Sequence, residues 1–309
     1  MNKMVITIAL VVVGLLLIGA VFYAKGKSGN GKEEISSEVV ECKDKFYYEV
    51  CCSGPKLSPG EYLFVKFIGE SGTHSVFGNN HIGGGLGKGK DGVARERSYK
   101  YGLPKAIDAI WASYTDRKVY HVSSLLPYDT ILSLFKNAGE PCLPITENPQ
   151  IAYALDCFDI CFLPEGKVIM YVKTGAKTIL LDWEAEGEEV NDDKILSEIY
   201  LRWGLDCMDS YFDVYYTDRF SDYEPMRAYK KRYGSIAPLL NQYLQRFNYS
   251  LEFDFEDDST SIYTVSSKFT NGEQHWETSK FNETFKMPSR LKESRMVWDT
   301  KDSHYTCFM

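Results

Sequence analysis

The stretch CFDICFLPEGKVIMYVK, residues 157–173, decides the fold of this chain. Residues 157–163 and 167–173 are rich in aromatic and β-branched side chains, which are typical of β-strands. Between them stands Pro164-Glu165-Gly166, a combination that favours a tight turn. The stretch therefore predicts two antiparallel strands joined by a short turn.

Strand signals continue upstream and downstream of this hairpin, separated by Gly, Pro and Ser turns. A helical spacing of apolar residues appears at 127–135. We expect strands at 45–52, 61–69, 106–114, 118–123 and 178–183, and a loop at 78–92. The first part of the chain, residues 35–190, is therefore predicted to form an antiparallel β-rich lobe.

From residue 191 the pattern changes. Asp192-Asp193 precede the amphipathic run ILSEIYLRWGLDCM, and acidic residues favour the N-terminus of a helix. A second helix is expected at 236–247, and strands at 251–255, 261–266, 295–299 and 304–308. We therefore predict an α+β protein, mostly antiparallel β with a few helices, whose second lobe spans residues 191–309.

The two predicted lobes contain a similar short sequence pattern. In the first, Leu103-Pro104-Lys105 leads to Trp111 and then to Tyr120. In the second, Arg290-Leu291-Lys292 leads to Trp298 and then to Tyr305, with the same spacing from Lys to Trp. This spacing predicts two strand pairs with equivalent buried tryptophans, and the second lobe is interpreted as a diverged repeat of the first.

The N-terminus carries the strongest apolar signal. Met4–Ala24 is 21 residues long and contains no charge, so as a helix it would match the hydrocarbon core of a bilayer. We predict a transmembrane anchor at residues 1–24 and a flexible tether at 25–34, KGKSGNGKEE. A cleaved signal peptide is the alternative. Lysines flank both ends of the apolar run, so charge alone gives only a slight preference for a cytoplasmic body.

Composition and charge narrow the class of partner. The chain is 44% hydrophobic and 25% charged, which is ordinary for a packed globular protein and excludes disorder. Its net charge is −8, and an acidic body repels phosphate backbones, so no nucleic-acid partner is expected.

Cysteine and histidine show no metal-ligand spacing. Cys157 and Cys161 lie in an apolar strand-like run together with Asp159, so we interpret the cysteines as small buried hydrophobes. The histidines form no HExxH or similar motif, and no metal site is predicted.

The glycine-rich segment 83–92 starts two nucleotide-binding patterns and completes neither. Gly84-x4-Gly89-Lys90 matches a Walker A skeleton, but Asp91 stands where Ser or Thr would hold magnesium. Gly87-x-Gly89-x-x-Gly92 matches the dinucleotide fingerprint without the surrounding strand–helix–strand unit. We therefore expect no cofactor, and a mobile, exposed surface loop.

Tyrosine and basic residues gather between positions 211 and 233, and these residue types anchor protein interfaces. The predicted interaction surface consists of Tyr211, Tyr215, Tyr216, Tyr223, Arg227 and Tyr229. Packing against the fold is the alternative role for these tyrosines. Asp206, Asp209 and Asp213 share a helix face and are interpreted as solvated, so no catalytic residue is predicted.

A glycine-rich loop at 83–92 and the motifs of residues 102–136 support a family resemblance. The order of these motifs resembles the bacterial family called domain of unknown function 2931. The motifs are the loop Gly83–Gly92, then Leu103-Pro104-Lys105, then Trp111 with Tyr120, and finally Leu126-Pro127 followed by Leu134-Phe135. Many members of that family are described as lipoproteins, although no lipid-attachment cysteine follows the apolar run here. The resemblance implies an envelope protein with its body in the periplasm, and it implies no catalytic residues.

These observations lead to two hypotheses about function. The first is a membrane-anchored protein of the bacterial inner membrane that binds another protein without catalysis, in the manner of an immunity protein. The alternative is an envelope hydrolase that acts on glycan or lipid. A pocket that collects two carboxylates would favour the hydrolase.

Overall fold

The computed structural model describes most of the chain from residue 44 onward. The described residues are 44–46, 48–69, 72–88, 90–93, 101–137, 156–174, 177–217, 224–251, 261–278, 285–299 and 304–308. The predicted anchor Met4–Ala24 and the predicted tether 25–34 lie outside these ranges. Within them, no helix is both long enough and apolar enough to cross a membrane.

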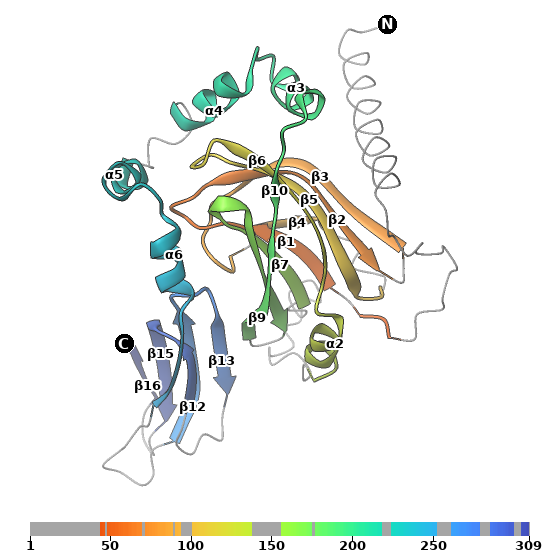
Figure 1. Cartoon of the computed structure of the whole chain (residues 1–309). Coiled ribbons are helices and arrows are strands. Elements are labelled where there is room, and N and C mark those ends of the chain that lie inside the picture. Colours follow the sequence, from red (N-terminus) through yellow and green to blue (C-terminus); the bar gives the residue numbers. More distant parts are fainter. Residues whose placement is uncertain are drawn as a thin grey trace, which may run out of the picture.

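Five of the described strands form an antiparallel sheet (Figure 1). They lie side by side in the order β10 (Glu188–Glu189), β6 (Lys118–Leu125), β5 (Pro104–Ser113), β2 (Gly60–Gly69) and β3 (Gly72–Ile82). A tight turn at residues 114–117 joins β5 to β6, as the sequence predicts. Arg117 takes a left-handed conformation there, with φ 56°, so the chain reverses within four residues.

Nine further described strands form a second sheet. Their order is β16 (His304–Phe308), β15 (Leu291–Asp299), β12 (Ser261–Phe269), β13 (Gln274–Thr278), β9 (Lys177–Glu186), β8 (Lys167–Thr174), β7 (Asp156–Phe162), β1 (Tyr48–Ser53) and β4 (Lys90–Val93). The predicted 157–173 hairpin is confirmed as β7 and β8, joined by the turn Pro164–Gly166. The described pairs are antiparallel apart from β1 with β7, and the mostly antiparallel α+β class is confirmed.

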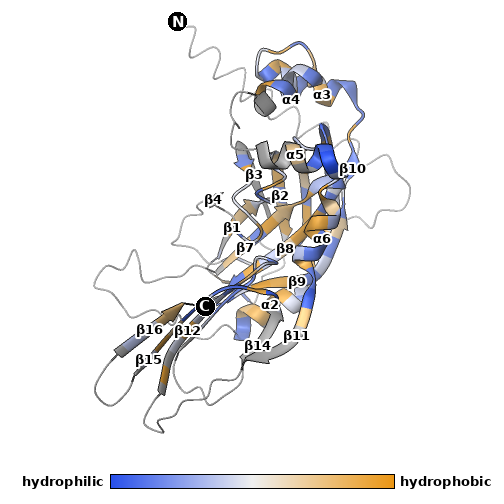
Figure 2. Cartoon of the chain, turned by 90° about the vertical axis from the view of Figure 1, so that its left-hand side faces the viewer, coloured by the Kyte–Doolittle hydropathy of each residue, from blue (hydrophilic) through white to orange (hydrophobic). Residues whose placement is uncertain are grey.

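The main core lies between the two sheets, and one buried cluster takes side chains from both. Tyr62, Phe67, Ile107 and Trp111 of the five-stranded sheet meet Phe158, Ile160, Met170 and Val172 of the nine-stranded sheet. Helix α2 (Tyr128–Asn137) adds Ile131 and Phe135 to the same cluster. Figure 2 shows hydrophobic residues concentrated in these central strands. Each large side chain buried in this way stabilises the fold by about 1.5–3 kcal/mol.

The remaining described helices are α3 (Asp193–Arg202), α4 (Met208–Thr217), α5 (Glu224–Tyr233) and α6 (Ala237–Leu244). The start of α3 is confirmed, because Asp192 Oδ1 accepts hydrogen bonds from the backbone N–H groups of Lys194 and Ile195. The amphipathic run predicted after Asp192 is helical only as far as Arg202, and α4 begins at the last residue of the run, Met208. Gly204, with φ +70°, lies just beyond the end of α3, where a left-handed residue commonly ends a helix.

The repeated sequence pattern around Trp111 and Trp298 corresponds to two similar strand pairs. Trp111 of β5 lies opposite Tyr120 of β6, with ring centroids 5.4 Å apart. Trp298 of β15 lies opposite Tyr305 of β16, with ring centroids 5.7 Å apart. The prediction that both tryptophans are buried is wrong for Trp298, which is half-buried. β15 and β16 form the outer end of their sheet, whereas β5 lies between β2 and β6. The duplication itself stays a prediction.

Several strands occupy positions where the sequence predicts loop or nothing regular. β3 and β4 include residues 78–82 and 90–92 of the predicted 78–92 loop. β13 carries the sequence QHWET, which has little apolar alternation, and it is fixed by pairing with β12 and β9. β14 (Phe285–Ser289) pairs with β11 (Arg246–Leu251). Through β9 and β13 the larger sheet continues across residue 190, and the division into lobes 35–190 and 191–309 stays a prediction.

Candidate functional site

Helices α3 and α4 form a hairpin that covers the outer face of the five-stranded sheet (Figure 1). A second buried cluster lies beneath this hairpin. It contains Leu63, Ile110, Tyr114 and Val119 from the sheet, and Ile199, Tyr211 and Phe212 from the helices. The helical hairpin is therefore packed against the sheet through an apolar layer of its own.

A buried carboxylate fixes the hairpin within that layer. Glu61 in β2 is 1% exposed, and its Oε2 atom accepts hydrogen bonds from the hydroxyl groups of Tyr114 (2.8 Å) and Tyr211 (3.0 Å). At the rim, the Arg117 guanidinium binds Asp209 (3.0 Å) and Asp213 (2.6 Å) of α4. These bonds hold α4 in one orientation, so the opposite side of the hairpin faces solvent.

The predicted tyrosine surface needs a correction. Tyr211 is fully buried, because its ring packs beneath α4 and its hydroxyl reaches Glu61. For Tyr211 the packing role is therefore confirmed and the interface role is wrong. Tyr215 and Tyr216 lie in α4, and Arg227 and Tyr229 lie in α5. Tyr223 lies outside the described residues.

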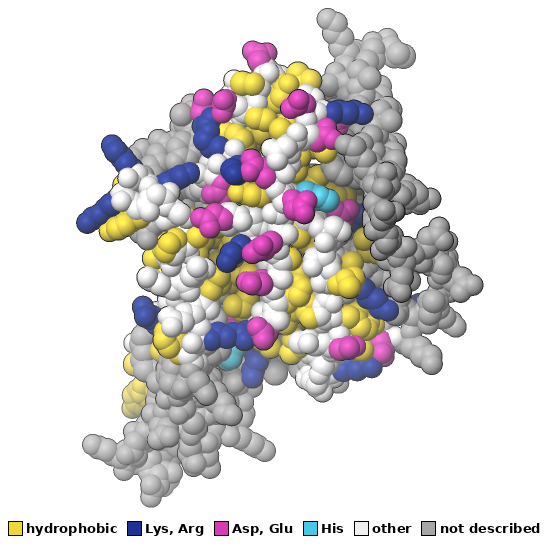
Figure 3. All heavy atoms as spheres, in the orientation of Figure 1, with side chains coloured by type: hydrophobic (Ala, Val, Ile, Leu, Met, Phe, Trp, Pro, Cys, Tyr) yellow, Lys and Arg dark blue, Asp and Glu magenta, His cyan; other side chains and the backbone are white. Residues whose placement is uncertain are grey.

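The solvent side of the helical hairpin exposes large apolar side chains that the sequence analysis overlooked. Leu201 is 62% exposed, Trp203 37% and Val214 39%. Residues 192–217 carry six acidic and two basic side chains. Figure 3 shows hydrophobic side chains set among acidic ones over this region. We call this side of α3 and α4 the hairpin face. The predicted solvation of Asp206, Asp209 and Asp213 is confirmed, although the last two also bind Arg117.

A cavity of about 390 Å³ opens between the glycine-rich segment and the turn that joins β12 to β13. Its basic lining residues are Lys56, Lys88, Lys268 and Lys292. They come from the turn after β1, the segment after β3, β12 and β15. We call it the lysine cavity. Sequence reasoning missed it because the fold gathers these lysines from four distant segments.

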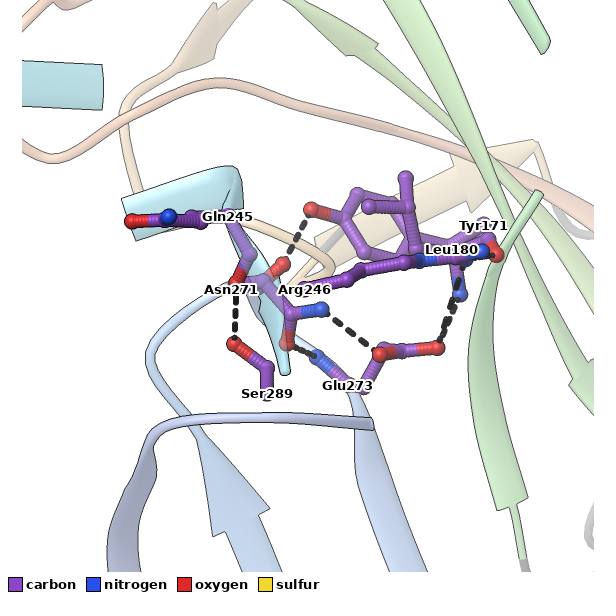
Figure 4. A network of polar contacts seen from close by, with 7 residues as sticks. All are labelled: Tyr171, Leu180, Gln245, Arg246, Asn271, Glu273 and Ser289. Carbon is purple, nitrogen blue, oxygen red and sulfur yellow. Dashed lines mark hydrogen bonds and ion pairs between the residues drawn. The ribbon is translucent and has the colours of Figure 1, made fainter. Parts of the chain in front are cut away.

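Glu273, the acidic residue in the lining of the lysine cavity, takes part in a buried network of hydrogen bonds (Figure 4). Glu273 Oε1 accepts the backbone N–H of Leu180 at 3.0 Å, and Oε2 accepts Asn271 Nδ2 at 2.6 Å. Arg246 lies 3.8 Å from Oε1 and also donates to the carbonyl oxygen of Leu180. The Tyr171 hydroxyl donates to the carbonyl oxygen of Asn271. The network therefore ties the β12–β13 turn to β8 and β9.

The glycine-rich segment is not the exposed loop that the sequence predicts. In residues 83–88, Gly83, Leu86 and Gly87 are buried. Gly87 has φ +61°, and a Cβ atom there would lie 2.8 Å from the carbonyl oxygen of Gly272. The backbones of the segment and of the β12–β13 turn therefore pack directly on each other, which explains why glycine is needed at this contact.

A second, smaller cavity of about 270 Å³ collects two carboxylates, those of Asp116 and Glu165. Asp116 Oδ2 accepts hydrogen bonds from Ser113 Oγ (2.9 Å), the Tyr120 hydroxyl (3.3 Å) and the backbone N–H of Glu165 (2.7 Å). Glu165 Oε1 accepts the hydroxyl of Ser235 at 2.6 Å. Burial, followed by the charge of Asp116, raises the pKa of Tyr120. We call this cavity the Asp116 pocket. Its hydrogen bonds join the β5–β6 turn to the start of α6.

The described cysteines divide into buried and accessible ones. Cys157 and Cys161 are buried, as predicted, and so are Cys51 and Cys52, whereas Cys207 is exposed and Cys307 half-buried. Burial raises the pKa of the Cys161 thiol, and hydrogen bonds from Ser210 lower that of Cys207. Among the described residues, no group of three or more His, Cys, Asp or Glu side chains is placed to hold a metal ion.

No family model, curated protein or solved structure matches this chain. The resemblance to the domain of unknown function 2931 therefore stays a prediction made from the sequence motifs.

Proposed function

We propose that this protein is a membrane-tethered binding module of the bacterial cell envelope, which holds a protein partner through the hairpin face and performs no catalysis. The proposal includes an inner-membrane anchor at Met4–Ala24 and a periplasmic body. The observation that supports it best is the exposure of Leu201, Trp203 and Val214 on one supported helical hairpin. Large apolar side chains rimmed by polar residues are typical of protein interaction sites.

The charge of the hairpin face defines the partner further. Because residues 192–217 carry six acidic and two basic side chains, the partner should present a basic surface around an apolar centre. Complementary charge accelerates association and makes it sensitive to salt. A basic toxin neutralised by this module, as in an immunity pair, has that chemistry.

The hydrogen bonds of the acidic side chains favour binding over catalysis. Glu61 and Glu273 are buried and accept hydrogen bonds from within the fold. Asp116 accepts hydrogen bonds from three groups of the fold. A general acid or base must reach its substrate, whereas these carboxylates are engaged in joining secondary-structure elements.

Site-directed photo-crosslinking tests the proposal in living cells. A photoreactive amino acid at position 203, in the full-length protein, should capture one discrete partner that is identified by mass spectrometry. The same amino acid at position 125 is the control, since Leu125 is 76% exposed but lies in β6. Co-expression should then relieve any toxicity of the captured protein. Equal crosslinking from both positions would contradict the proposal.

An envelope hydrolase is the second candidate, and the Asp116 pocket is the observation that favours it. Two carboxylates, Asp116 and Glu165, line it, and a pair of carboxyl groups is what glycoside hydrolysis requires. Incubation of the protein with peptidoglycan and with envelope lipids tests this candidate. Product release that is lost in both Asp116→Asn and Glu165→Gln would favour the hydrolase over the binding module.

A further inference from the structure

The lysine cavity brings together four like charges in a protein whose net charge is −8. Lys56, Lys88, Lys268 and Lys292 reach it from four separate segments of the chain. Four cations around one cavity repel one another, and the repulsion is relieved when an anion enters.

The charge of the lysine cavity is compensated only in part from within the described residues. Lys268 Nζ binds Glu293 Oε1 at 2.8 Å. In the part of the chain that the structure describes, no ion pair joins Lys56, Lys88 or Lys292 to an acidic side chain. Burial, with the charges of Lys292 and Lys268, lowers the pKa of Lys88 although the charge of Glu293 opposes this shift, which agrees with the close approach of the lysines.

The walls of the lysine cavity are built by the fold. On one side the glycine-rich segment packs on the β12–β13 turn through the contact of Gly87 with Gly272. The Glu273 network fixes that turn from beneath (Figure 4). Leu86, Leu240 and Phe269 supply buried apolar lining. The cavity therefore combines cationic side chains with an apolar wall in a fixed frame.

We propose that the lysine cavity binds a small ligand that carries phosphate groups on an apolar or sugar body. The volume of about 390 Å³ lies within the range of small-molecule sites. Lysine ammonium groups bind phosphate as point charges, and the apolar wall accommodates the body of the ligand. Phosphorylated sugars and phospholipid headgroups share this chemistry. The inference goes beyond the proposed function, because the cavity and the hairpin face lie on different elements.

Isothermal titration calorimetry of the full-length protein, in a neutral maltoside detergent, tests the inference. Pyrophosphate and glucose 1-phosphate represent soluble phosphates. Mixed micelles of phosphatidylglycerol, compared with phosphatidylcholine, represent the lipid headgroup. Saturable binding of the soluble phosphates supports a free phosphate ester, and binding of phosphatidylglycerol alone supports a headgroup. No binding of any phosphate, or binding of poly-glutamate alone, would overturn the inference.

Two lysine variants make the test specific to the cavity. The double variant Lys88→Gln/Lys292→Gln should weaken phosphate binding at least about tenfold, since it removes two charge-assisted contacts. Lys231→Gln, at an exposed position of α5, is the matched control and should bind as the parent does. Thermal melts without ligand should show the double variant folded and no less stable, because a repulsion has been removed. Unchanged binding by the folded double variant would refute the site.

Discussion

Replacing Tyr211 by Phe isolates the bond that docks the helical hairpin on the sheet. The substitution removes one hydroxyl and keeps the ring in the cluster beneath α4. Tyr211 is 0% exposed and Glu61 1% exposed, and the hydroxyl donates to Glu61 Oε2 at 3.0 Å. The variant therefore changes one hydrogen bond in a fully buried layer.

The expected loss follows from the burial of the acceptor. Removing one hydrogen-bond partner of a buried acceptor costs about 1–3 kcal/mol. The Tyr114 hydroxyl still donates to Glu61 at 2.8 Å, so we expect Tyr211→Phe to lower the free energy of unfolding by about 1–3 kcal/mol. The double variant Tyr211→Phe/Tyr114→Phe should lose more than the sum of the single losses, because Glu61 Oε2 then loses both tyrosine hydroxyls.

Urea unfolding of the detergent-solubilised protein, followed by tryptophan fluorescence, measures these losses. Tyr233→Phe is the matched control, because Tyr233 is 57% exposed and its change should stay within about 0.5 kcal/mol. A loss for Tyr211→Phe no larger than that of the control would refute the docking role. It would also reopen the interface role that the sequence first suggested for Tyr211.

Three further predictions follow from the described geometry. Iodoacetamide should label Cys207 before the buried Cys52 and Cys161, as peptide mass spectrometry of the native protein would show, because Cys207 is exposed with a lowered pKa whereas burial raises the pKa of the other two thiols; equal labelling would contradict this. Gly87→Ala should lower the midpoint of urea unfolding more than Gly204→Ala, since both have positive φ but only the first is blocked by a neighbouring carbonyl; equal losses would contradict this packing. Calorimetric phosphate affinity should fall as pH rises from 7 to 10, because the lowered pKa of Lys88 makes it lose its proton earlier than a free lysine; a rise would contradict the site.

Local signals predicted much of the fold. The Pro164–Gly166 turn and its flanking strands were found from turn chemistry and alternation, and the start of α3 from Asp192. Neither feature needs knowledge of distant residues. The final strand, predicted at 304–308, is β16 with the same bounds.

Long-range pairing accounts for what the sequence did not reveal. The parallel contact of β1 with β7 and the pairing of β13 with β9 depend on partners about a hundred residues apart. β11, at Arg246–Leu251, was not predicted, and β14 supplies its partner; the strand predicted at 251–255 lies outside the described residues beyond Leu251. A pattern within one segment carries no information about which distant edge it meets.

The candidate sites were harder to predict for the same reason. The composition around Tyr211 predicts a surface residue, because Tyr is common at interfaces. A Tyr side chain can also be buried when its hydroxyl has a hydrogen-bond partner, and for Tyr211 that partner is Glu61. The lysine cavity needs four segments to converge. The sequence did not reveal that Leu201 and Trp203 are exposed. Both belong to the apolar pattern of a predicted helix, and only the fold shows which side of that helix packs against the sheet.

The dissociation constant of the crosslinked partner, measured with Leu201→Asp, tests the central claim most directly. Leu201 is 62% exposed, so an aspartate there should leave the fold intact and place a charge on the hairpin face. The account predicts at least about tenfold weaker binding, the effect of losing one interface anchor. Leu125→Asp, on β6, should change the constant by less than about twofold. Equal affinity for the two variants would contradict binding through the hairpin face.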